Sequence, residues 1–193
     1  MTDKADLRAT IAAARVSLTD GEREHARAAI RQLVLTHCAA IGLAAGSVIA
    51  GYQPLRTEPG SLSLLAELDR AGYRVIVPVT LADRDLDWTW WPAPEAEVGA
   101  APELLGLAAI GEASLILVPA FAVDRFGNRL GRGGGSYDRA LGRVQPGTPV
   151  AALLYDGELV ERVPTEAWDR PVGLAATPSG LIELTPSGRR NTR

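Results

Sequence analysis

The chain is poor in the residues that build disulfides and metal clusters. Its 193 residues include one cysteine, Cys38, and two histidines, His25 and His37. A single cysteine excludes an internal disulfide and a clustered-thiolate metal site. Two histidines on the same expected helix give no basis for a histidine-centred catalytic triad or zinc site. The only lysine is Lys4, so the chain has no Walker A loop, which needs a lysine before its Ser or Thr.

Long apolar runs and a strong net charge are also missing. No run approaches the ~18 apolar residues that a transmembrane helix needs. The first residues carry acids and no apolar core, so we expect no secretory signal. The net charge of −3 gives no reason to expect nucleic acid or an anionic membrane as a partner. We therefore expect a cytoplasmic monomer that binds a small molecule.

Apolar periodicity predicts helices that alternate with short buried strands. Thr19 and Glu22 have the spacing of a capping box at the start of the second helix. The strand at 86–91 alternates like a half-exposed strand, with Trp88 and Trp90 on one face. The expected helices are 4–16, 19–41, 61–71 and 135–143, and the expected strands are 47–52, 74–79, 86–91, 114–118, 150–155, 172–177 and 181–184.

This order predicts an α/β fold, a single-domain three-layer sandwich with a mostly parallel central sheet flanked by helices. We expect one domain over residues 1–184 and a disordered tail over 185–193. No internal repeat or linker divides the chain.

Residues 119–139 carry the clearest chemical signal. Glycines at 131, 133, 134 and 135 leave the backbone open to a ligand, and a helix is expected to follow. Arginines at 125, 129, 132 and 139 supply fixed positive charge for phosphate oxygens. Asp138 adds a hard oxygen ligand of the kind that Mg²⁺ prefers. The segment therefore predicts a phosphate site with a nearby metal ligand.

Two other interpretations of the glycines fit this segment less well. A mobile surface loop would explain glycines alone, but the buried strand before this loop and the helix after it favour a ligand site. A dinucleotide-binding fingerprint should begin within a few residues of its strand, whereas these glycines begin about a dozen residues after it.

The run DRFGNRLGRGGGSYDR resembles the signature of the 5-formyltetrahydrofolate cyclo-ligases, also called methenyltetrahydrofolate synthetases. Lys4 and Arg8 match the Lys-x-x-x-Arg of the family's first helix. Tyr52-x-Pro-x-x-x-Glu58 resembles its substrate-binding segment, and Asp169 stands where the family has a second metal-associated Asp. The resemblance extends from residue 4 to about residue 177.

The sequence also departs from the family pattern at particular positions. Ser136 stands where the first Tyr of Tyr-Tyr-Asp is usual, and Ala120 stands where Gly is usual after Pro119. Gly173 replaces a common acid, and Gly134 replaces a lysine in a way that the family tolerates.

The resemblance implies an enzyme that uses ATP and Mg²⁺ to close the formyl group of 5-formyltetrahydrofolate onto its 10-nitrogen, giving 5,10-methenyltetrahydrofolate, ADP and phosphate. It also implies roles for individual residues. The expected nucleotide site comprises Lys4, Arg8, Arg129, Gly131, Arg132, Gly133, Gly134, Gly135, Ser136 and Tyr137, with Arg129 and Arg132 in catalysis. The expected folate site comprises Tyr52, Glu58, Arg132 and Ser136, and the expected Mg²⁺ ligands are Asp138 and Asp169.

Two other functions stay open at this point. Ser136 and Gly173 are compatible with a non-catalytic paralogue that binds nucleotide or folate as a sensor or store. A different ATP-dependent ligase or kinase acting on another small acid is the third hypothesis, because a fold alone does not fix a substrate.

Overall fold

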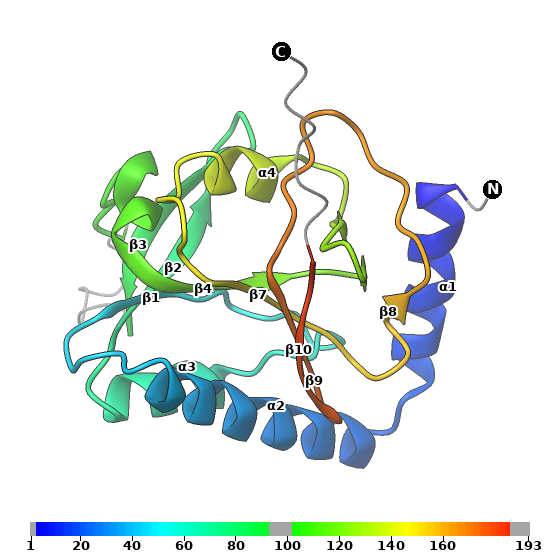
Figure 1. Ribbon diagram of the computed structural model, residues 1–193, viewed down its shortest axis with the longest axis horizontal. Helices are drawn as coiled ribbons and strands as arrows, with labels where there is room; N and C mark the ends of the chain where they lie inside the picture. The colour runs from blue at the N-terminus through cyan, green and yellow to red at the C-terminus, as the bar shows by residue number, and fades with distance from the viewer. Residues whose placement is uncertain (1–2, 93–101, 186–193) are drawn as a thin grey trace.

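The computed structural model describes residues 3–92 and 102–185. Figure 1 shows the course of the chain. Its helices are α1 (Lys4–Ser17), α2 (Asp20–Ala40), α3 (Leu62–Arg70), the 3₁₀ helix η1 (Leu107–Glu112) and α4 (Ser136–Leu141). Its strands are β1 (Val48–Ala50), β2 (Arg74–Thr80), β3 (Leu86–Trp91), β4 (Ala113–Pro119), β5 (Ala122–Asp124), β6 (Arg129–Leu130), β7 (Val150–Leu153), β8 (Leu159–Val160), β9 (Leu174–Thr177) and β10 (Gly180–Glu183).

Side-chain caps set the starts of two helices where the sequence predicted them. The Thr19 side chain accepts from the Glu22 backbone N–H, and the Glu22 side chain accepts from the Thr19 backbone N–H, which completes the capping box of α2. Ser61 caps α3 by accepting from the Leu64 N–H. Both predicted helix starts are confirmed. They could be predicted because a cap depends only on residues within one turn.

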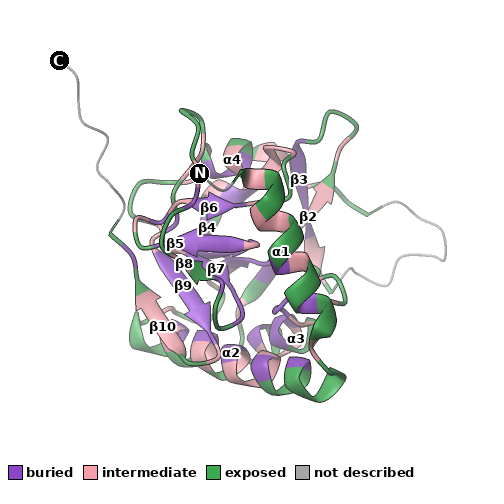
Figure 2. Cartoon of the chain, turned by 90° about the vertical axis from the view of Figure 1, so that its right-hand side faces the viewer, coloured by how far each residue is buried: buried purple, intermediate pink, exposed green. Residues whose placement is uncertain are grey.

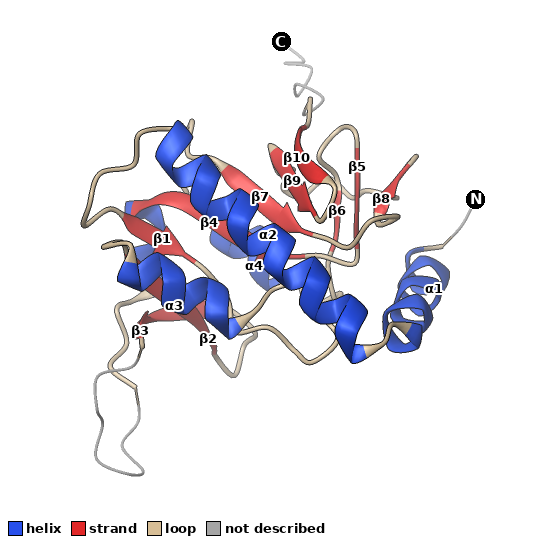
Figure 3. Ribbon diagram, turned by 90° about the horizontal axis from the view of Figure 1, so that it is seen from below, coloured by secondary structure: helices blue, strands red, loops and turns tan. Residues whose placement is uncertain are grey.

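The central sheet has seven strands in the order β10-β9-β7-β4-β1-β2-β3. The inner neighbours are all parallel, whereas β10 and β3 pair antiparallel at the two edges. Helices α2 and α3 cover one face, and α4 and η1 lie on the other, as Figures 1 and 3 show. The predicted α/β sandwich with a mostly parallel sheet is therefore confirmed.

A second, three-stranded sheet of order β6-β5-β8 lies in two segments for which the sequence predicted no strand. Asp124 is fully buried and holds these two segments together. Its carboxylate accepts from Phe126, from the backbone and side chain of Asn128, and from the Val163 N–H. Helix α1 packs against this sheet through Ile11, so it stands apart from α2 and α3 (Figures 1 and 2).

The expectation of a half-exposed β3 was wrong. Trp88 is fully buried, and Asp87 and Thr89 on the other side of the strand are also buried. The cause is the segment before η1, which covers this edge of the sheet. Leu105 donates its N–H to the Trp88 carbonyl at 2.8 Å, and Gly106 donates its N–H to Asp87 Oδ1 at 2.7 Å.

Cys38 lies on the buried face of α2 with none of its surface exposed. Burial raises the pKa of its thiol to about 11, so very little thiolate exists near neutral pH. We expect a thiol reagent such as DTNB to label no cysteine in the native protein and one per chain in denaturant. Fast labelling of the native protein would contradict the packing of α2.

Within residues 3–92 and 102–185, no helix combines the length and apolar character required to cross a membrane. Thr185 donates its N–H to the Arg125 carbonyl at 3.1 Å. The rest of the tail expected over 185–193 lies outside the described residues.

Candidate functional site

A cavity of about 680 Å³ opens at the carboxyl ends of β1, β2 and β4. Open α/β sheets place their ligands at this end of the parallel strands. The cavity is lined by every residue of the expected nucleotide, folate and Mg²⁺ sites: Lys4, Arg8, Tyr52, Glu58, Arg129, Gly131, Arg132, Gly133, Gly134, Gly135, Ser136, Tyr137, Asp138 and Asp169. The expectation that Arg125 and Arg139 also serve the phosphates was wrong, because Arg125 lies over the Phe126 ring and Arg139 donates to the Arg84 carbonyl, and neither lines the cavity. Four separate parts of the chain therefore meet at one site.

The glycine segment forms one wall and needs its glycines for definite reasons. Gly133 and Gly135 have φ angles of +101° and +67°, which are strained for other residues. A Cβ atom at Gly131 would lie 2.5 Å from Arg129 Nη1. Arg8 of α1 holds this wall by donating from Nε to the Gly131 carbonyl at 2.8 Å.

Arg129 is fixed beneath the glycine segment. It is 8% exposed, and its Nη2 donates to Asp138 Oδ1 at 3.1 Å. Its guanidinium carbon lies 5.7 Å from the centre of the Tyr137 ring. Among the described residues, Arg129 Nε and the Tyr137 hydroxyl have no hydrogen-bond partner, so both retain donor capacity in the cavity wall.

Lys4 joins the first turn of α1 to the loop after β8. Its Nζ lies 3.0 Å from Asp169 Oδ2 and 3.4 Å from Glu166 Oε2. Asp138 reaches the same loop, because its Oδ1 accepts the Arg170 N–H at 3.1 Å. The two carboxylates expected to hold Mg²⁺ are thus connected through adjacent residues of one loop.

The described residues contain no cluster of three or more His, Cys, Asp or Glu side chains suited to a metal. However, Asp138 Oδ2 and Asp169 Oδ1 make no hydrogen bond in the described part of the chain. Mg²⁺ that accompanies a nucleotide is typically held by one or two carboxylates, phosphate oxygens and water. The residues present fit that arrangement and not an all-protein metal cage.

Glu58 and Arg132 face each other at the other end of the glycine segment. Glu58 is 8% exposed, and its Oε2 accepts the Leu55 N–H at 2.8 Å. Arg132 Nη1 lies 3.8 Å from Glu58 Oε1, and the Arg132 side chain is 64% exposed. Burial and the charge of Glu58 raise the pKa of Tyr52 well above its ordinary value, so this phenol stays protonated.

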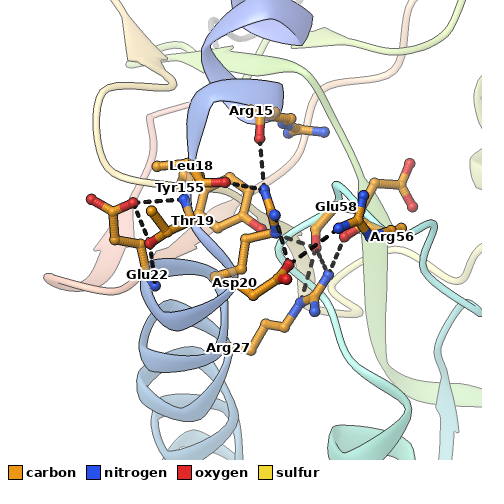
Figure 4. A network of polar contacts seen from close by, with 10 residues as sticks. Arg15, Leu18, Thr19, Asp20, Glu22, Arg27, Arg56, Glu58 and Tyr155 are labelled. Atoms are coloured by element: carbon orange, nitrogen blue, oxygen red, sulfur yellow. Dashed lines mark hydrogen bonds and ion pairs between the residues drawn. The ribbon is translucent and has the colours of Figure 1, made fainter.

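The segment that carries Glu58 is held by α2 and by Tyr155, which follows β7. Arg27 donates to the backbone carbonyls of Arg56, at 2.6 Å, and Glu58, at 3.0 Å. Figure 4 shows these contacts together with the capping box at the start of α2. The Tyr155 hydroxyl donates to the same Glu58 carbonyl at 3.2 Å. Arg27 and Tyr155 therefore hold the backbone at Glu58 through its carbonyl oxygen.

A buried ion pair that the sequence reasoning missed lies at the cavity floor. Arg15 is 3% exposed and lines the cavity. Its Nε and Nη2 donate to the two carboxylate oxygens of Glu158 at 2.7 and 2.8 Å, and Nη2 also donates to the Ala120 carbonyl at 2.6 Å. Burial alone would lower the pKa of Arg15, but Glu158 raises it above its ordinary value. Arg15 follows Lys4, Arg8 and Ile11 at helical spacing, and this stripe was the available signal.

Trp168 also lines the cavity, although the sequence predicted no role for it. By contrast, Trp88 and Trp90 pack into the core beside α4, and Trp91 packs into the core beside α2 and α3. None of these three tryptophans lines the cavity.

Comparison with known proteins gives a consistent family. A sequence profile described as "5-formyltetrahydrofolate cyclo-ligase family" matches residues 1–178 of this chain. A 5-formyltetrahydrofolate cyclo-ligase from Mycolicibacterium smegmatis is 40% identical over 151 residues, which cover 72% of this chain and 78% of that protein. One from Escherichia coli is 32% identical over 139 residues, which cover 67% and 74%.

Solved structures show the same fold. The 5,10-methenyltetrahydrofolate synthetase of Aquifex aeolicus is 26% identical, with a TM-score of 0.72 and coverage of 96% of this chain and 94% of that one. That of Mycoplasma pneumoniae is 20% identical, with a TM-score of 0.76 and coverage of 91% and 99%. The chain belongs to the 5-formyltetrahydrofolate cyclo-ligase family.

Proposed function

We propose that the chain catalyses the ATP- and Mg²⁺-dependent cyclisation of 5-formyltetrahydrofolate to 5,10-methenyltetrahydrofolate, with release of ADP and phosphate. The observation that carries this proposal is the meeting of a glycine-rich wall, basic side chains and a buried carboxylate in one cavity, in a chain of this family. This arrangement offers separate places for a triphosphate and for the hydrogen-bond donor edge of a pterin.

The chemistry requires the formyl oxygen to become a leaving group. In the proposed reaction this oxygen attacks the γ-phosphorus, and ADP departs. The 10-nitrogen then attacks the activated carbon and loses its proton, and the carbon–oxygen bond breaks to release phosphate. Such a route needs alignment and charge neutralisation from the protein and no protein nucleophile.

The two arginines suit different parts of this task. Arg129 is buried and anchored to Asp138, so it presents a fixed charge below the glycine segment. Arg132 is exposed and lies beside Glu58, so it can follow the transferring phosphoryl group between the nucleotide and the formyl oxygen. We assign Lys4 and Arg8 to the remaining phosphates, since both line the same cavity from α1.

Asp138 and Asp169 would hold Mg²⁺ through their free oxygens, directly or through water, and the bound ion would neutralise charge on the phosphates. Glu58 would accept from the amino and ring N–H groups of the pterin. Tyr52 and Ser136 would line that end of the cavity.

The near-ultraviolet absorbance of the methenyl product tests the proposed function. Protein, Mg·ATP and 5-formyltetrahydrofolate are mixed, and we expect this absorbance to rise. Folate binding with no product would favour the sensor or store that Ser136 suggests. Absence of folate binding would favour an ATP-dependent enzyme for another acid.

Glu58→Gln tests the folate end of the site. The pterin edge would lose a charged acceptor, which is worth about 1.5–3 kcal/mol, so we expect the KM for 5-formyltetrahydrofolate to rise about 10- to 100-fold. The KM for ATP should change little. The amide still has an oxygen for the Leu55 N–H, so the thermal midpoint should be retained.

Initial rates measured against each substrate in turn distinguish the two KM values. Glu183→Gln is the matched control, because Glu183 is exposed on β10 and lies outside the cavity. An equal rise in both KM values for Glu58→Gln would contradict a pterin-specific role.

We also propose that the enzyme acts as a cytoplasmic monomer. Support for a reducing compartment comes from the single cysteine, Cys38, which is buried and forms no disulfide. Cell fractionation and sedimentation equilibrium test these two points.

A further inference from the structure

Trp168 is the only exposed Phe, Tyr or Trp side chain within residues 3–92 and 102–185. It is 64% exposed and lines the cavity. Covering a large apolar ring that is exposed to water lowers the free energy, and planar aromatic groups cover an indole best. The feature therefore indicates a planar partner at this end of the cavity.

The loop that carries Trp168 is held in place on both sides. Asp169 donates its N–H to the Glu166 carbonyl at 3.2 Å and accepts the Glu166 N–H on Oδ2 at 2.9 Å. Lys4 binds both of these side chains, and Arg170 donates its N–H to Asp138. Trp168 thus sits on a fixed turn of the cavity rim.

A chain of contacts shows which end of the cavity this is. It begins at Glu58, whose Oε1 lies 3.8 Å from Arg132 Nη1. Gly131 precedes Arg132, and its carbonyl accepts a hydrogen bond from Arg8 Nε at 2.8 Å. Arg8 stands one helical turn after Lys4, which lies 3.0 Å from Asp169, next to Trp168. Glu58 and Trp168 therefore lie at the two ends of this series of contacts.

A nucleotide whose γ-phosphate points toward Glu58 has its base at the other end of its phosphates. We propose that Trp168 stacks on the purine base of the nucleotide and so forms the base subsite of the cavity. This inference rests on the proposed function for the direction of the nucleotide.

Tryptophan fluorescence and calorimetry test the stacking without reference to turnover. Mg·ADP should quench the emission of the wild-type protein, while inorganic triphosphate, which has no base, should bind without quenching. In Trp168→Phe the quenching should disappear and ADP affinity should be nearly retained. Trp168→Ala should weaken ADP binding about 10-fold by calorimetry, and triphosphate binding should not change.

Several results would overturn the inference. One is ADP affinity that stays at the wild-type value in Trp168→Ala; another is an equal loss of ADP and triphosphate binding, which would mean that Trp168 only supports the loop. A third is quenching by 5-formyltetrahydrofolate and not by ADP, measured with correction for folate absorbance. Failure of the proposed function looks different, because ADP would still quench Trp168 while no methenyl product formed.

Discussion

Arg132→Ala is expected to lower kcat about 10³-fold, because a mobile arginine that neutralises a transferring phosphoryl group contributes on this scale. The side chain is 64% exposed and its only ion pair in the described residues is the 3.8 Å contact with Glu58. Its removal should therefore leave the free energy of unfolding within about 0.5 kcal/mol of wild type. Single-turnover rates of methenyl formation measure the chemical step directly.

Two variants make the Arg132 result specific. Arg132→Lys keeps the charge but loses the planar fork of donors, so we expect only partial recovery of kcat. Arg162→Ala is the matched control, since Arg162 is exposed and does not line the cavity. A kcat near wild type in Arg132→Ala would remove this residue from the catalytic assignment.

Glu158→Ala is expected to destabilise the protein by about 3–5 kcal/mol, because it leaves the Arg15 guanidinium buried without its counter-charge. Glu158 is 5% exposed, and it also accepts the Tyr155 N–H at 2.9 Å. Its loss should loosen α1 and the Glu58 segment together, since Tyr155 supports the Glu58 carbonyl. Urea unfolding followed by circular dichroism measures the change.

Replacement of both partners separates the pair from the packing around it. Arg15→Met combined with Glu158→Met removes both charges, so this double variant should be more stable than Glu158→Ala alone. Glu183→Ala serves as the exposed control. A Glu158→Ala protein within about 1 kcal/mol of wild type would show that the pair does not hold α1 on the rest of the fold.

The sequence predicted those elements whose signals are local. Capping by Thr19 and Ser61 depends on neighbouring residues, and the apolar strand β4 is recognisable by itself. The small sheet of β5, β6 and β8 was missed because its strands are two or three residues long and depend on Asp124, which bonds Val163 far along the chain. The burial of β3 was also missed, because it depends on contacts with Leu105 and Gly106, which lie well beyond the strand in the sequence.

The site was predictable where a motif carried it. The glycine segment was indicated by its own residues, whereas Lys4, Arg8 and Glu58 were indicated by the family resemblance, and all of them line one cavity. Arg15 was not, because its role comes from Glu158, 143 positions later. Trp168 was not, because exposure at a cavity rim is a property of the folded loop and not of its sequence.

The central claim is that the formyl oxygen leaves on phosphate, and oxygen-18 transfer tests it most directly. 5-Formyltetrahydrofolate labelled in its formyl oxygen is converted with Mg·ATP, and the released phosphate is examined by mass spectrometry. The mechanism predicts one labelled oxygen in phosphate for each methenyl product. Methenyl formation with unlabelled phosphate and the label in water would contradict it.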